Sequence, residues 1–196
     1  MNKMYKLIEE LWFLKRDLIS DDFDRALFRL AEEIPQMRIH EFDTGEVCWT
    51  WRIPEKWTCH EAYLETLEGR RLLDYADHPL HVVSYSLPFE GDVSRQELLE
   101  HLHVHPRLPD AIPFVFKYYE RDWGLCTTQE LKQSLTDEQY RVVILTSFEP
   151  GKLKVGEIII PVQSDQTFMF VAHLCHPAMV NADLTGVVFG LYVAKT

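Results

Sequence analysis

The chain has 196 residues, of which 46% are hydrophobic and 26% charged, a balance that is typical of a globular protein and excludes disorder. It carries 20 Lys and Arg against 31 Asp and Glu, so the formal net charge is −11. Because this acidic charge repels a phosphate backbone, nucleic acid is excluded as a partner. No stretch approaches the roughly 20 apolar residues of a membrane span, so we expect no membrane association. The four cysteines show no paired spacing, which predicts reduced thiols in a cytoplasmic protein.

Two amphipathic helices are predicted at the start of the chain. Between residues 5 and 18 the apolar side chains recur every three to four positions, which is the spacing of one helical face. Ser20 then offers N-cap chemistry for a second helix, which runs through Leu30 and ends before Pro35. Both helices are interpreted as covering helices that carry no chemistry.

The period of the apolar residues changes to two at Met37, which predicts strands. A turn at Thr44-Gly45 joins the first two of them, and a helix that begins after Ser94 interrupts the series. The predicted strands cover residues 38–42, 47–53, 80–87 and 140–145. This pattern predicts a mixed, β-rich domain in the middle of the chain.

Two further apolar strands are predicted at 156–161 and 167–172, joined by a polar turn. The second is apolar on both faces, as expected of a strand inside a helix-covered sheet. It leads directly into His173, and a last helix is predicted from 184 to 194.

The segment 173–186 carries the most informative group of polar residues. His173, His176 and Asp183 lie within eleven positions, between the end of a buried strand and the start of a helix. Ligands of open α/β sheets bind outside the carboxyl ends of the strands, and imidazole with carboxylate suits zinc. These three residues are therefore candidate metal ligands. The alternative is that both histidines are satisfied loop residues and that Asp183 is a helix N-cap.

Three other groups allow a functional and a structural interpretation. His101, His103 and His105 alternate as on a strand, but the preceding helical period favours a solvated helix end over a metal site. Cys126 is either a reactive thiol or, more in keeping with its aromatic neighbours, a packed one. The tryptophans at 49, 51 and 57 either stack on sugars or pack in a core.

The segment from His173 to Gly186 resembles bacterial aminopeptidase-like domain proteins, in which His-x-Cys-His-Pro is followed by Ala-Asn-Asp-Asn-Leu-Ser-Gly. The likeness extends along nearly the whole chain. Further segments similar to that family are 51–57, 81–86, 108–113, 118–126 and the strand that contains Gly156-Glu157.

The resemblance implies an α/β fold, namely part of a leucyl-aminopeptidase-like zinc peptidase sheet with an inserted mixed, β-rich domain. Residues 1–36 would be the N-terminal helices of the peptidase-like domain and 37–150 the insertion. Residues 151–196 would start the sheet and carry the ligand loop. The chain would then correspond to the N-terminal half of such a protein, or to a truncated product.

The family pattern also assigns roles at the loop. His173 falls at the first strand-end ligand, Cys175 at the residue that orients it, and His176 is an additional imidazole that ligates or holds substrate. The bridging aspartate of the pattern falls on Ala182, and alanine cannot bridge two cations. Either Asp183 replaces that aspartate from the next position, or the second metal site is weakened or absent.

Two functions follow from the resemblance. The first is a zinc-dependent aminopeptidase-like hydrolase that acts on an N-terminal peptide bond or a related amide, with zinc as cofactor and a peptide or small amide as substrate. The second is a non-catalytic binding or scaffold module that keeps the fold without a complete metal centre. No catalytic residue is assigned, because the family supplies its general base and later ligands beyond this point. A homo-oligomer is compatible with either function.

Overall fold

The computed structural model describes residues 3–195, which form two compact units of mixed α/β structure. The first unit comprises the described parts of Met1–Lys56 and Pro150–Thr196, and the second is Trp57–Glu149. The second unit is therefore continuous in sequence and is flanked by the two segments of the first. It begins at 57 rather than at the expected 37, because residues 38–43 pair with a strand that follows Pro150.

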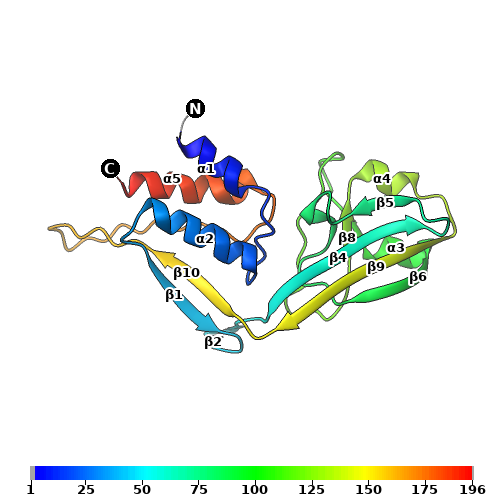
Figure 1. The fold of residues 1–196 in the computed structure, drawn as a ribbon, viewed down its shortest axis with the longest axis horizontal. Helices are drawn as coiled ribbons and strands as arrows, with labels where there is room; N and C mark the ends of the chain where they lie inside the picture. The colour runs from blue at the N-terminus through cyan, green and yellow to red at the C-terminus, as the bar shows by residue number, and fades with distance from the viewer. Residues whose placement is uncertain (1–2, 196) are drawn as a thin grey trace. The chain divides into compact units, whose positions relative to one another are not determined.

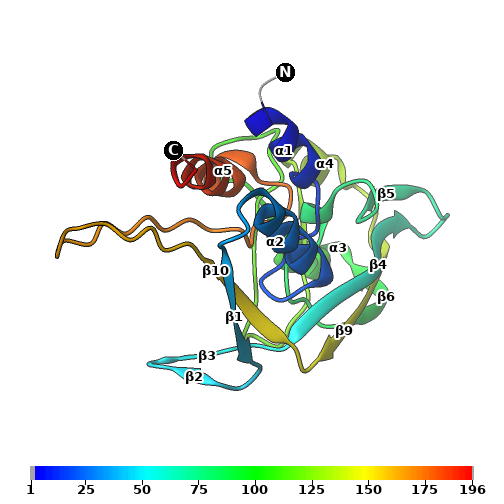
Figure 2. The same cartoon turned by 60° about the vertical axis from the view of Figure 1, so that its left-hand side comes forward.

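Three helices build the core of the first unit. Helices α1 (Lys3–Leu11), α2 (Asp21–Glu33) and α5 (Thr185–Val193) lie close together (Figures 1 and 2). Ser20 caps α2 as predicted, its Oγ accepting from the Phe23 amide at 3.2 Å. The predicted first helix is shorter than expected and ends at Leu11. The shared core consists of Leu7, Leu11, Phe23, Ala26, Leu27, Leu30, Ile34, Leu174, Leu184, Val188 and Leu191.

The strands of the first unit form two separate antiparallel pairs. β1 (Arg38–Asp43) and β10 (Lys152–Glu157) are antiparallel, with Arg38 opposite Glu157. β2 (Val47–Cys48) and β3 (Trp51–Arg52) form a second pair. The predicted strand 47–53 is thus interrupted by a turn at Trp49, whose φ of 56° is left-handed.

The second unit is built on a four-stranded sheet in the order β5-β4-β9-β6 (Figure 1). A parallel pair, β7 and β8, lies outside it. In chain order, the elements of the second unit are β4 (Lys56–Thr66), β5 (Arg71–Asp74), η1 (Pro79–His81), β6 (Phe89–Ser94), α3 (Arg95–His101), β7 (Leu102–Val104), β8 (Leu125–Thr127), α4 (Gln129–Ser134) and β9 (Gln139–Glu149).

The prediction of a strand at 80–87 is wrong. After η1 the chain makes only two isolated bridges, from Val82 to Leu125 and from Ser84 to Phe116. Tyr85 then adopts a left-handed φ of 67°. An extended ladder cannot continue through a left-handed residue. Residues 82–86 are all buried, so the alternating sequence pattern does not mark a half-buried strand here.

The prediction of two strands at 156–161 and 167–172 is also wrong. β10 ends at Glu157, and residues 158–175 have no regular structure. We call residues 158–172 the arm; it projects from β10 as an extended loop (Figure 2). A strand is stabilised by backbone hydrogen bonds to a neighbour, and no strand pairs with the arm within the described range. No helix among residues 3–195 is long and apolar enough to cross a membrane.

Cys126 lies in β8 and has no exposed surface. Burial raises the pKa of its thiol to about 12, because the thiolate loses its solvation. The structure therefore favours the packed thiol over the reactive one. Cys48, in contrast, is exposed.

We expect iodoacetamide at neutral pH to alkylate Cys48 in the native protein and to leave Cys126 unmodified, because only the thiolate reacts. Peptide mass mapping measures both sites in one digest. Protein unfolded in urea is the control, in which both cysteines should be labelled. Native labelling of Cys126 at the rate of Cys48 would contradict the buried assignment.

Candidate functional site

Two imidazoles lie side by side where the arm returns to the helices. The rings of His173 and His176 have centroids 5.6 Å apart and meet edge to face. His173 is exposed and His176 is half-buried. The two candidate ligands therefore lie near each other, although the strand expected to carry them is absent.

Asp183 lies in a short π-helical turn, η2 (Val180–Leu184), and its side chain is fully buried. Its Oδ2 accepts a hydrogen bond from the His176 amide at 2.7 Å and lies 3.2 Å from the His176 Nδ1. The N-cap position of α5 is Leu184, so Asp183 is not the cap of that helix. The carboxylate instead fixes the backbone and the ring of His176.

Arg16 also holds this loop and is itself completely buried. Its Nη2 donates to the carbonyls of His176 at 2.7 Å and Met179 at 3.3 Å, and its Nε donates to that of Leu174 at 3.5 Å. Burial lowers the pKa of the guanidinium, and the negative charge of Asp183 partly opposes that shift. Arg16 was not among the sequence candidates, because a single arginine within a predicted amphipathic helix carries no motif.

Residues 182 and 183 face opposite ways. Ala182, where the family pattern has its bridging aspartate, is exposed, whereas Asp183 is buried. One Asp183 oxygen is engaged with His176, and its Oδ1 is buried without a hydrogen-bond partner among the described residues. A carboxylate at 183 therefore does not occupy the exposed position that residue 182 provides.

The donor set fits part of a zinc site. Two adjacent imidazoles are suitable ligands, but catalytic zinc usually has three protein ligands. Within residues 3–195 no group of three or more His, Cys, Asp or Glu side chains is arranged to hold a metal. The described residues thus supply at most two neighbouring imidazoles with an orienting carboxylate, and the set His173, His176 and Asp183 stays a prediction.

The histidines at 101, 103 and 105 have separate roles in the second unit. His101 stacks on Trp123 with centroids 4.0 Å apart. His103 is partly buried, and desolvation lowers its pKa. His105 accepts hydrogen bonds through Nδ1 from the amides of Arg107 and Leu108. The expected solvated helix end is wrong for this segment, because only His101 ends a helix, His103 lies in β7 and none of the three histidines is exposed.

The tryptophans likewise do not share one role. Trp57 is buried, and its Nε1 donates to the Ser86 carbonyl at 3.0 Å, as core packing predicts. Trp49 is 97% exposed at the tip of the β2–β3 hairpin. A sugar-stacking surface that includes Trp57 is therefore wrong.

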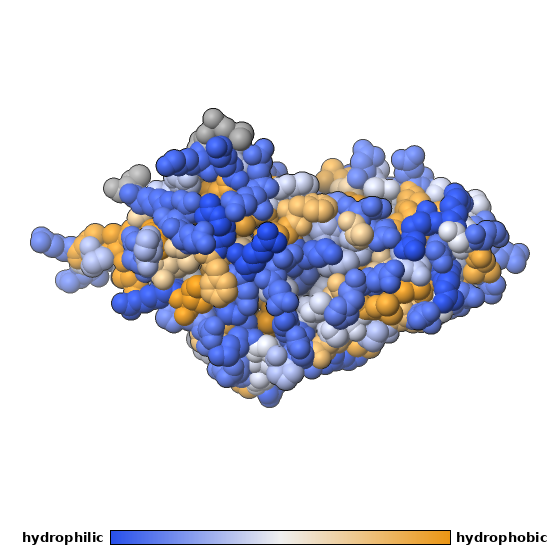
Figure 3. All heavy atoms as spheres, in the orientation of Figure 1, coloured by the Kyte–Doolittle hydropathy of each residue, from blue (hydrophilic) through white to orange (hydrophobic). Residues whose placement is uncertain are grey.

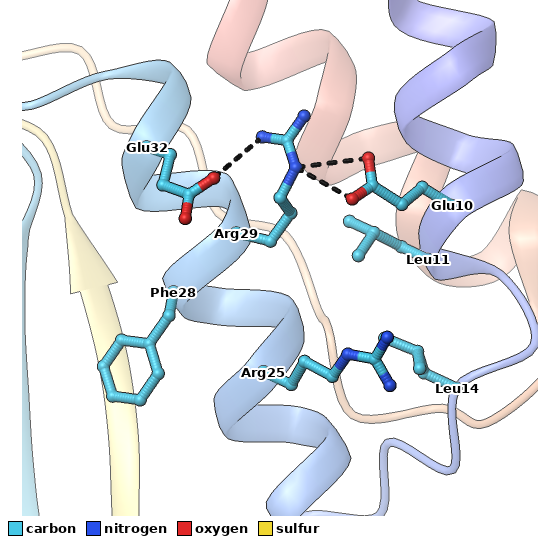
Figure 4. Close-up of a pocket in the computed structure, with 7 residues that line it drawn as sticks. All are labelled: Glu10, Leu11, Leu14, Arg25, Phe28, Arg29 and Glu32. Carbon is cyan, nitrogen blue, oxygen red and sulfur yellow. Dashed lines mark hydrogen bonds and ion pairs between the residues drawn. The ribbon is translucent and has the colours of Figure 1, made fainter.

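A hollow on the first unit lies between α1 and α2 (Figure 4). Arg29 crosses it, with Nε 3.0 Å from Glu10 Oε1 and Nη1 3.0 Å from Glu33 Oε1. These pairs raise the pKa of the guanidinium against the opposing effect of desolvation. The arginine thus ties the two helices together and is engaged with protein carboxylates.

Comparison with known proteins connects this geometry to a group of relatives. Residues 56–147 match a family described as a domain of unknown function, DUF2172. The chain is 33% identical over 193 residues to a protein of Clostridium acetobutylicum named "Putative polysaccharide biosynthesis protein with aminopeptidase-like domain". That alignment covers 98% of this chain and 44% of the relative.

A solved structure shows the same similarity. It is a crystal structure described as a "putative peptidase" from Clostridium acetobutylicum, with 33% identity and a TM-score of 0.88 over 98% of this chain and 46% of that one. The chain therefore spans less than half the length of the relatives it matches. Its resemblance to the N-terminal half of aminopeptidase-like domain proteins is confirmed.

The contacts of Arg16 predict a large stability cost for Arg16→Met. The change removes the bonds to three loop carbonyls and leaves the Asp183 charge buried without its counter-charge, which should cost about 3–5 kcal/mol in the free energy of unfolding of the first unit. Hydrogen exchange of the α2 and α5 amides reports on that unit. The matched control is Arg29→Met, whose partly exposed pairs should contribute about 1 kcal/mol or less. Equal effects of the two changes would contradict the proposed role of Arg16.

Proposed function

We propose that this chain, which resembles the N-terminal half of aminopeptidase-like domain proteins, is the part of a zinc-dependent amide hydrolase that contributes His173 and His176 to the metal. The observation that carries the proposal is the pair of adjacent imidazoles 5.6 Å apart, one of them oriented by a buried carboxylate. Its relatives carry the names of a peptidase and of an aminopeptidase-like domain. The proposed substrate is an N-terminal peptide bond or a related amide.

The contact between His176 and Asp183 supports this assignment. Metal-binding histidines usually donate their second ring N–H to a carboxylate, which fixes the tautomer and the ring orientation. With Nδ1 of His176 directed at Asp183, the ligating atom in this proposal would be Nε2. Asp183 is then a positioning residue, and the ligands would be His173 and His176.

When zinc is bound at such a site, it supplies Lewis-acid activation of a carbonyl group. The residues of this chain would hold that site at a defined place, because Arg16 binds carbonyls of the loop and Asp183 binds the His176 amide. Additional ligands and the general base would come from the length of the relatives that this chain does not span. The arm would form one edge of a leucyl-aminopeptidase-type sheet, with α5 packed against it. The second unit would be the insertion in that domain.

A second candidate function is a non-catalytic binding or scaffold module. The observation that favours it is the exposed Ala182 at the position of the bridging aspartate, together with the absence of a three-ligand group among residues 3–195. Such a module would keep the fold and the loop but would bind no zinc.

The zinc proposal predicts that His173→Ala and His176→Ala each weaken zinc binding by more than about tenfold, because each removes one of two ligands. Asp183→Asn should weaken it by about 10–100-fold, since it removes the charge that orients His176. Isothermal titration with zinc, together with elemental analysis of the dialysed protein, measures the affinity and stoichiometry.

His40→Ala is the matched control, because His40 is an exposed histidine of the first unit that pairs with Glu157 outside the loop. It should leave zinc binding unchanged. Zinc binding that survives both loop substitutions would reject the assignment, and no zinc binding by the unaltered chain would favour the scaffold function.

The opposite orientations of residues 182 and 183 predict that Ala182→Asp raises zinc affinity or stoichiometry. The new carboxylate would be exposed at the position of the bridging residue, while Asp183 remains bonded to His176. The same titration compares the two proteins. Equal affinity and stoichiometry would mean that position 182 is no longer part of a metal site.

A further inference from the structure

Trp49 occupies a position that costs the isolated chain stability. It lies in the two-residue turn between β2 and β3, since Cys48 pairs with Trp51, and its φ is 56°. Turn positions with positive φ favour Gly, Asn or Asp, and a bulky residue there is strained. The indole gains no packing in return, because Trp49 is 97% exposed. Strained and exposed aromatic residues of this kind mark sites of contact with another molecule.

The hairpin presents this indole on a firm base. The Gly45 amide donates to the Ile53 carbonyl and the Ile53 amide to the Glu46 carbonyl, both at 2.9 Å. Arg52 Nη1 donates to the Gly45 carbonyl at 2.7 Å. The hairpin lies at the end of the β1–β10 ribbon that is remote from α1 (Figures 1 and 2). A side chain held on a preorganised turn loses little conformational freedom on binding, which favours association.

The hollow between α1 and α2 has the chemistry that receives an indole. Its volume is about 360 Å³, near the lower end of the roughly 300–1,000 Å³ range of ligand pockets, which suits one ring system. Leu11 and Leu14 supply apolar lining beside the guanidinium groups of Arg25 and Arg29 (Figure 4). Over the helices of the first unit, Figure 3 shows small hydrophobic areas set among hydrophilic side chains. Guanidinium groups stack on aromatic faces, and Trp is the best such partner.

The charges of the two features are complementary. The Arg25 side chain is 74% exposed and lies 4.0 Å from Asp22, so its charge is accessible to a partner. Asp43 and Glu46, at the base of the hairpin, are exposed carboxylates. Opposite charges fix the register of an interface. The net charge of −11 on each chain opposes association, but ions screen that repulsion beyond about 8 Å at physiological ionic strength, so close contacts decide the outcome.

We propose that the β2–β3 hairpin of one copy of this chain inserts Trp49 into the α1–α2 hollow of a second copy. Each copy carries both features, so a twofold axis makes the same contact twice. An aromatic side chain buries roughly 150–250 Å², and two of them supply only part of the roughly 1,200–2,000 Å² of a stable interface. The dimer is therefore weak and reversible. The proposal goes beyond the proposed hydrolase function and does not depend on zinc.

Disulfide trapping tests the contact directly. Cys48 is exposed beside Trp49, and Glu32 lines the hollow with a side chain that is 72% exposed. We expect mild oxidation of the Glu32→Cys chain to link position 32 of one copy to Cys48 of another, because a disulfide forms only when the two Cα atoms lie within about 7 Å. Peptide mass mapping identifies the link. Glu61→Cys, at an exposed glutamate of the second unit, is the matched control and should give no link to Cys48.

Sedimentation velocity measures the assembly itself. We expect the unaltered chain to form dimers as its concentration rises and Trp49→Asn to stay monomeric. Asn is favoured at positive φ, so this variant should melt at the same temperature as the unaltered chain or higher. Arg25→Glu should weaken the dimer by more than about tenfold, because it reverses a charge at the contact. Arg107→Glu makes the same change in net charge at an exposed residue of the second unit and should leave the dimer unchanged.

Three results would overturn the proposal. The first is a chain that stays monomeric at its highest soluble concentration, and the second is a dimer that survives Trp49→Asn. The third is oxidation that links Cys48 to position 61 as readily as to position 32, since that pattern reports random collision. A lower melting temperature of Trp49→Asn, measured by circular dichroism, would show that the indole packs on its own chain and would also count against the contact.

Discussion

The loop that carries His173 and His176 depends on one buried cation, the guanidinium of Arg16. The guanidinium of Arg16 has no exposed surface and donates to the carbonyls of residues on both sides of His176. A charge removed from water must be compensated by hydrogen bonds and an opposite charge, and here the carbonyls and the nearby Asp183 provide both. Arg16 and Leu174 are 158 positions apart in sequence. This contact therefore joins the two sequence segments of the first unit.

The buried Arg16 guanidinium also decides what each polar group of this loop can do. Asp183 is buried on the side of Arg16 and is bonded to the His176 amide, so its charge is used to hold the loop. His173 and His176 lie on the more exposed side, with rings near each other. A planar guanidinium with several fixed donors suits this task because it can bind several carbonyls at once. The loop thus presents imidazoles outwards from a rigid base.

The arm shows why hydrophobic pattern and secondary structure are separate properties. Its apolar run is the pattern of a strand buried on both faces, yet the segment is irregular and exposed. Pattern encodes the environment in which a segment is stable, whereas a strand also needs a neighbour for its backbone groups. Where α5 provides one face through Gly186 and Gly190, the arm does pack closely.

The sequence by itself determined the local elements of this protein. Helical spacing and the Ser20 cap predicted α2, and the alternation after Met37 predicted β1. The metal site expected of His173, His176 and Asp183 stays a prediction. The helix and its cap depend on contacts within a few residues, which sequence patterns record, whereas β1 also needs its distant partner β10. Only the tertiary structure decided that 80–87 and 158–172 are not strands and that Asp183 points inwards. Each depends on partners distant in sequence: neighbouring strands in the first two cases, and in the last the compact packing of Arg16 against the loop.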